Sequence, residues 1–106
     1  MAKIDAGSLS YMQHRAYTFI RLPHRQRRRH IRRERHKALR DLPLLYEVLV
    51  LLHGRQCAVC GCKYNLTIDH ILPISRGGRT TMANLQLLCE RHNKEKDAEI
   101  MDFREG

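Results

Sequence analysis

The sequence predicts a small α+β fold in which N-terminal helices precede a metal-stabilised domain. The first half has apolar residues at helical spacing, the second half has two short strand-like segments, and paired Cys and His residues flank those strands. The chain of 106 residues has two Phe, four Tyr and no Trp, so its core is small. A domain of this size often needs a metal ion or an oligomer to be stable.

The first helix is predicted over residues 11–21, and Pro23 ends it. Its apolar residues recur at helical spacing and are Met12, Ala16, Phe19 and Ile20. A second helix is predicted between Pro43, which suits a first turn, and Gly54, which suits the position after a helix end. The segment Leu44–Leu52 between them is strongly apolar, so we expect it to be the main core element.

The segment His24–Arg40, between these helices, is almost uniformly basic. Residues 1–52 hold 12 Lys and Arg against 4 Asp and Glu, and ten of those cations lie within Arg21–Arg40. Like charges four residues apart destabilise a helix, so we expect this segment to become helical when phosphates neutralise it. A solvated surface is the alternative, but so dense a run favours a nucleic acid. The expected phosphate contacts are Arg25, Arg28, Arg29, Arg32 and Arg33.

Two strands and a closing helix are predicted next. Leu66–Ile74 alternates apolar and polar residues and ends in a loop at Pro73, Leu85–Cys89 forms the second strand, and Glu90–Phe103 forms the helix. Two further arginines, Arg76 and Arg79, lie in the loop between the strands. They are placed to contact substrate, although loop solubility explains them equally well.

The bulk properties limit the function classes. A net charge of +9 and a pI of about 10.0 favour a polyanionic partner. No apolar stretch reaches the roughly 18–20 residues of a membrane span, and no secretory signal is visible. Without such a signal, Cys-x-x-Cys pairs indicate metal ligands in a reducing compartment, so we expect an intracellular protein.

The metal ligands expected from spacing are Cys57, Cys60, Cys89 and His92, because two tight turns each supply two ligands to one zinc ion. The 28 residues between Cys60 and Cys89 require a folded element between the turns. Cys62 lies two residues after Cys60, and we expect it to be a free thiol.

A second polar set lies inside this pattern: Asp69, His70, Asn84 and Asn93. A lone histidine on a strand is more often a core residue than a catalyst. Here, however, His70 follows Asp69 directly, and a neutral imidazole near pH 7 can take a proton from water. Asp and Asn oxygens suit a hard ion such as Mg²⁺, which stabilises the leaving oxygen of a phosphodiester.

Together these residues resemble the HNH endonuclease family. The resemblance rests on Cys57-x-x-Cys60-Gly61, on Ile68-Asp69-His70-Ile71-x-Pro73-x-x-x-Gly77-Gly78, and on Asn84-Leu85-x-x-Leu88-Cys89-x-x-His92-Asn93-x-x-Lys96. It implies the ββα-metal fold of that family for a domain spanning residues 43–106. Residues 1–42 are then a basic, mainly helical extension.

The resemblance also implies roles for the polar residues. His70 would be the general base, Asp69 and Asn93 would hold the catalytic divalent ion, and Asn84 would pin the loop that orients His70. Two departures matter: His92 stands where Cys is common, which makes the zinc site more pH-sensitive, and Asn93 makes this an H-N-N variant. An Asn oxygen favours Mg²⁺ or Mn²⁺ over softer ions.

The resemblance therefore implies a metal-dependent endonuclease that hydrolyses phosphodiester bonds of DNA, with RNA as an alternative substrate. The rival hypothesis is a zinc-stabilised nucleic-acid-binding module without cleavage activity. A third is an accessory subunit of a phage or mobile-element nucleoprotein complex. A homodimer and a larger complex of that kind are both open, and we expect a bacterial or phage-encoded protein.

Overall fold

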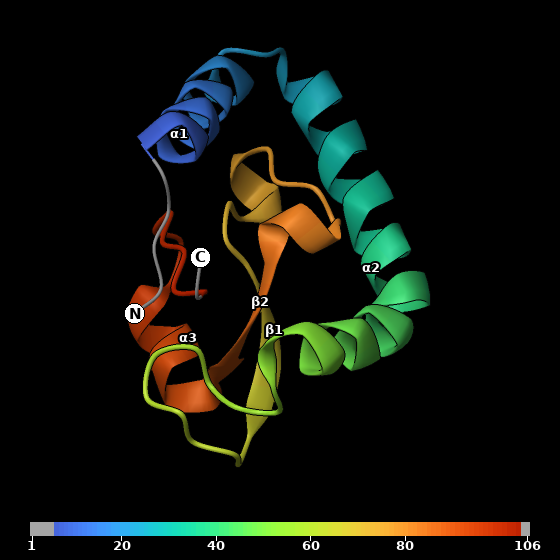
Figure 1. Ribbon diagram of the computed structural model, residues 1–106. Coiled ribbons are helices and arrows are strands. Elements are labelled where there is room, and N and C mark those ends of the chain that lie inside the picture. The colour runs from blue at the N-terminus through green and yellow to red at the C-terminus, as the bar shows by residue number, and fades with distance from the viewer. Residues whose placement is uncertain (1–5, 105–106) are drawn as a thin grey trace.

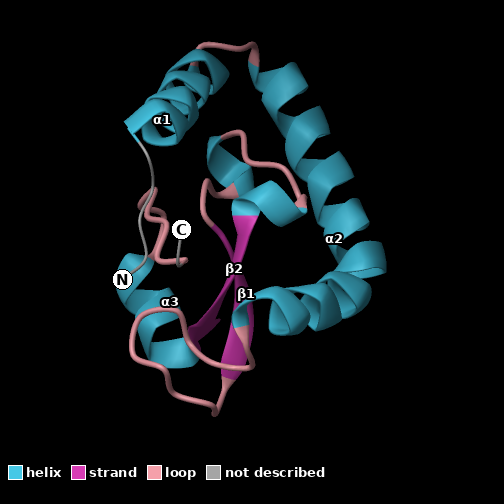
Figure 2. Ribbon diagram, in the orientation of Figure 1, coloured by secondary structure: helices cyan, strands magenta, loops and turns pink. Residues whose placement is uncertain are grey.

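The computed structural model describes residues 6–104, with side chains from Ser10 onward. The fold is α+β, as predicted, with helices around a two-stranded antiparallel sheet (Figure 2). Leu66 pairs with Cys89 and His70 with Leu85, so the strands are in register along their whole length. The elements are α1 (Ala6–Ile20), α2 (His24–His53), β1 (Leu66–His70), η1 (Ile74–Arg76), η2 (Met82–Asn84), β2 (Leu85–Cys89) and α3 (Glu90–Lys96).

The long helix α2 corrects one prediction. We expected the basic segment and the apolar helix to be separate elements, but they form a single helix of 30 residues with Pro43 inside it. Figure 1 shows that this helix curves along one side of the molecule and changes direction in its green part. A proline removes one hydrogen bond from a helix and commonly bends it. The predicted domain boundary at residues 42 and 43 falls within α2 and stays a prediction.

The helix α2 contributes less to the core than we predicted. Leu49 is fully buried and packs with Leu85 and Leu87 of β2, but Leu44 and Leu51 remain 70% and 84% exposed. The buried stripe of α2 begins earlier, because His30, Glu34 and Ala38 are buried at intervals of four residues. This packing explains why the basic segment is helical despite its charge, since a buried face stabilises a helix more than propensity does. None of the described helices is both long and apolar enough to cross a membrane.

The ends of β1 and α3 also differ from prediction. We expected β1 to reach residue 74, but it ends at His70. The next two backbone N–H groups form hydrogen bonds with Asn84. Ile71 N–H donates to the backbone oxygen of Asn84, and Leu72 N–H donates to its side-chain Oδ1. We expected α3 to reach Phe103, but it ends at Lys96, because Asp97 has a φ of 51°.

Candidate active site and metal centre

Four side chains, from the turn at Cys57–Cys60, the end of β2 and the start of α3, form a candidate metal centre. The ligand atoms of Cys57, Cys60, Cys89 and His92 all lie within 4.8 Å of one another. Cys89 Sγ is 3.2 Å from His92 Nδ1 and 4.0 Å from Cys60 Sγ. A tetrahedral zinc ion with bonds of about 2.0–2.3 Å separates its ligand atoms by about 3.5–3.8 Å. The four residues predicted from spacing therefore fit one zinc ion.

Local backbone turns bring these ligands together. Gly61 N–H donates to the oxygen of Cys57, and Cys57 N–H donates to the oxygen of Cys62, which closes the first turn. Burial acts to raise the pKa of the Cys57 thiol, but hydrogen bonds from neighbouring backbone groups lower it to about 6. A thiolate is the form that binds zinc. Cys62 lies outside the four-residue group and contacts the backbone of Tyr64.

His70 lies at the end of β1, on the face opposite to Asp69, because successive strand residues alternate. Its Nε2 is 2.9 Å from Thr80 Oγ1, and no described residue forms a hydrogen bond with its Nδ1. Burial lowers the pKa of His70 below its usual value of 6.5, and nearby Lys96 lowers it further, against an opposing effect of Glu34. The imidazole is therefore neutral at pH 7, which is the form that can accept a proton.

The β1–β2 connection, residues 71–84, is held in place by the side chain of Asn84. This buried amide accepts a hydrogen bond from Leu72 N–H at 2.8 Å, and it donates to the oxygens of Leu72 and Arg79. Glycine is required at two positions of this connection. Gly77 has a φ of 99° and lies against Phe19 of α1, and a Cβ at Gly78 would overlap the carbonyl oxygen of Leu72. The connection thus reverses tightly directly beside His70.

Asp69 forms a buried ion pair with Lys96 of α3. The two side chains are only 7% and 1% exposed, and Lys96 Nζ lies 3.2 Å from Asp69 Oδ2. Gln86, which is fully buried on β2, donates to the same carboxylate oxygen at 2.8 Å. Burial raises the pKa of Asp69, and the contacts with Gln86 and Lys96 offset only part of that rise. Lys96 also donates to the backbone oxygen of His70, which ties α3 to the end of β1.

Asn93 lies on the same interface between β1 and α3. Its Nδ2 donates to Thr67 Oγ1 at 2.7 Å. Thr67 and Asp69 share one face of β1, and Asn93 and Lys96 share one face of α3, so these two faces meet. The contacts found among the described residues use Oδ2 of Asp69 and Nδ2 of Asn93. The Oδ1 oxygen of each side chain takes part in none of these contacts, and carboxylate and amide oxygens are the ligand types that a hard divalent cation prefers.

A comparison with known families is consistent with this geometry. A family model described as HNH endonuclease matches residues 57–99, the segment that contains the metal centre, both strands and α3. Residues 57–99 belong to the HNH endonuclease family. Membership implies a nucleic acid as the partner of this HNH segment. No curated protein matches the chain.

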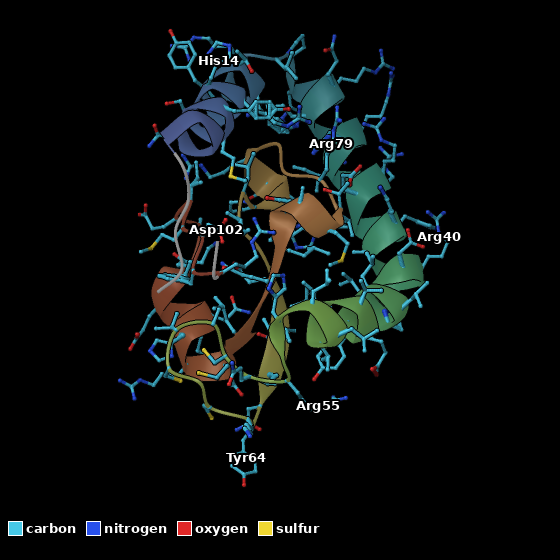
Figure 3. All side chains as sticks on the ribbon, viewed as in Figure 1. His14, Arg40, Arg55, Tyr64, Arg79 and Asp102 are labelled. Carbon is cyan, nitrogen blue, oxygen red and sulfur yellow. The ribbon has the colours of Figure 1, made fainter. Side chains whose placement is uncertain are left out.

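A basic groove lies between α2 and the β1–β2 connection of the HNH segment. In Figure 3, Arg79 lies beside α2. The residues that line the groove are Arg29, Arg32, Arg33, Glu34, His36, Lys37, Arg40 and Arg79. Arg25 and Arg28 lie on α2 outside it, and Arg76 donates to the backbone oxygen of Ala98. The structure therefore brings four of the seven predicted phosphate contacts into one groove.

Sequence reasoning missed several residues that surround His70 and Asp69. Gln86 holds Asp69 and also binds the C-terminal tail, because it donates to Met101 and accepts from Phe103 N–H. Thr80 contacts His70, and Glu34 of α2 contacts Thr80. Only Glu34 had a signal in the sequence, since it is the one acidic residue within Arg21–Arg40.

Proposed function

We propose that the protein is a metal-dependent endonuclease that hydrolyses phosphodiester bonds of DNA. The observation that carries the proposal is the state of His70. Its imidazole is kept neutral by burial, its Nε2 is held by Thr80, and its Nδ1 has no partner among the described residues. A neutral and oriented histidine with one free nitrogen is suited to act as a general base. Family membership of residues 57–99 supports the same chemistry.

In this proposal His70 Nδ1 takes the proton from the attacking water. Asp69 Oδ1 and Asn93 Oδ1 would hold a Mg²⁺ or Mn²⁺ ion, which supplies charge stabilisation to the phosphodiester when bound. Lys96 lies against the same carboxylate and favours its ionised form, which offsets part of the rise in the pKa of Asp69 that burial causes. Asn84 holds the β1–β2 connection beside His70 and takes no part in the proton transfer.

The basic groove would bind the backbone of the DNA. Its arginines contact phosphates without reading bases, so we expect affinity that depends on salt and little on sequence. Arg79 places one of these cations on the β1–β2 connection, one residue before Thr80. One residue that lines the groove is therefore the sequence neighbour of Thr80, which contacts His70.

The zinc ion would be structural. Four protein ligands close its coordination sphere, and a closed sphere is typical of a site that stabilises the fold. The two ions would thus be bound by different residues. Zinc would be coordinated by Cys57, Cys60, Cys89 and His92, and the neighbouring Asn93 would coordinate the catalytic ion.

Incubation with supercoiled plasmid tests the proposal. We expect nicked or linear DNA with Mg²⁺ or Mn²⁺, and no product in EDTA or with the His70→Ala variant. The matched control is His14→Ala, since His14 is an exposed histidine on α1, at the top of the view in Figure 3. Wild-type protein that retains DNA but leaves it uncut with either ion would refute the proposal.

That outcome would support the second candidate, a zinc-stabilised nucleic-acid-binding module. One observation favours this candidate, namely that Lys96 already pairs with Asp69 inside the protein. A binding module needs only the zinc centre and the basic groove, so its affinity for DNA would be independent of Mg²⁺.

A further inference from the structure

One acidic side chain in the basic part of α2 is buried. Glu34 is 5% exposed and stands alone among the ten Lys and Arg of Arg21–Arg40. A buried carboxylate lowers stability unless hydrogen bonds compensate its lost hydration. Ala38, one turn later on the same buried stripe, shows that a small apolar residue suffices for packing. The packing of α2 therefore does not by itself explain why a carboxylate is buried at position 34.

Its contacts lead directly to the β1–β2 connection and to His70. Glu34 Oε1 accepts a hydrogen bond from Thr80 N–H at 2.7 Å, and the backbone oxygen of Glu34 lies 3.4 Å from Thr80 Oγ1. Thr80 is 1% exposed, and its Oγ1 lies 2.9 Å from His70 Nε2. A single residue thus joins α2 to the imidazole. The only cation paired with Glu34 among the described residues is Arg33, at 3.9 Å and largely exposed.

These contacts are compatible with one tautomer of His70, in which Nε2 carries the hydrogen. A backbone oxygen only accepts, so the contact at 3.4 Å between Thr80 Oγ1 and the backbone oxygen of Glu34 suits a hydroxyl hydrogen that points to that oxygen. Thr80 Oγ1 then accepts a hydrogen from His70 Nε2. With Nε2 protonated, the lone pair of the neutral ring lies on Nδ1. The side chain of Glu34 holds Thr80 through the N–H of that residue, and so it holds in place the hydroxyl that contacts His70 Nε2.

We propose that Glu34 is a positioning residue for His70 and acts through Thr80. The basic helix α2 then has two roles, since its exposed side chains face the groove and its buried acid orients the base. The proposal rests on the nuclease function proposed above. It extends the active site beyond the HNH segment, because Glu34 lies outside residues 57–99.

Two pairs of variants test this inference in the full-length, zinc-loaded protein. Glu34→Ala removes the acceptor of Thr80 N–H, whereas Glu34→Gln keeps an acceptor oxygen in the same place. Thr80→Val removes the hydroxyl, whereas Thr80→Ser keeps it. We expect the first member of each pair to lower kcat on plasmid DNA by about 10-fold to 100-fold, which is the scale of a misplaced catalytic group. KM should change little, and the second members should stay within about twofold of wild type.

The control is His30→Ala, because His30 holds the same connection at Gly78 without contacting Thr80. All rates are measured at a temperature at which every variant is folded by circular dichroism. A normal kcat in Glu34→Ala would overturn the inference, as would an equal loss in His30→Ala, which would indicate general loosening of the connection. A wild-type protein that does not cleave DNA would instead refute the proposed function, so the two failures are distinguishable.

Discussion

Replacement of Asn84 by Ala should be the most destabilising change to the β1–β2 connection. The residue is 7% exposed, and its side chain forms three hydrogen bonds, one from Leu72 N–H and two to the oxygens of Leu72 and Arg79. Each such bond contributes about 1 kcal/mol net, and a buried N–H left without a partner costs a further 1–3 kcal/mol or so. The expected loss is about 4–6 kcal/mol, a large part of the roughly 5–15 kcal/mol that stabilises a small domain.

Urea unfolding at a fixed zinc concentration measures this loss. The matched control is Asn93→Ala, which removes one hydrogen bond from a half-buried side chain, Nδ2 to Thr67 Oγ1. We expect that control to lose about 1 kcal/mol. The reasoning is refuted if Asn84→Ala is no less stable than Asn93→Ala, because the three bonds would then contribute nothing beyond one.

Three further predictions follow from the metal centre, the glycines and the groove. The purified protein should hold one zinc ion per chain by mass spectrometry, and Cys57→Ser should lose both zinc and folded structure whereas Cys62→Ser keeps them. Gly78→Ala should lower the free energy of unfolding by about 1–3 kcal/mol or more, because the added methyl group would overlap a backbone oxygen; an unchanged melting temperature would contradict this. Arg33→Gln in the groove should weaken DNA binding and reduce the salt slope by about 0.9, whereas Arg91→Gln, whose side chain pairs with Glu95 on α3, should not.

The metal centre and the sheet were predictable because local spacing decides them. Cys57 and Cys60 reach one ion from a single turn, so their sequence separation already fixes their geometry. The alternation of Leu66–His70 and the apolar run Leu85–Cys89 gave both strands in the correct order. The family resemblance predicted the pattern of residues 57–99, which the family model matches.

The surroundings of His70 were not predictable in the same way, because they come from distant parts of the chain. Thr80 and Glu34 are 46 residues apart, and no periodicity in the sequence connects them. The charge pattern of α2 suggested an isolated basic segment, but its buried stripe is visible only once the helix packs on the connection. Likewise Pro43 looked like a helix start, and packing on both sides of it keeps α2 continuous.

The most direct test of the account is the single-turnover rate of DNA cleavage by the His70→Ala variant. Enzyme is added in excess over plasmid in Mg²⁺ or Mn²⁺, and retention of DNA is measured on the same samples. Loss of a general base lowers a rate by about 10²-fold to 10⁴-fold, so we expect a loss of that size with DNA binding unchanged. Cleavage by His70→Ala at the wild-type rate would contradict the assignment of His70 as the base.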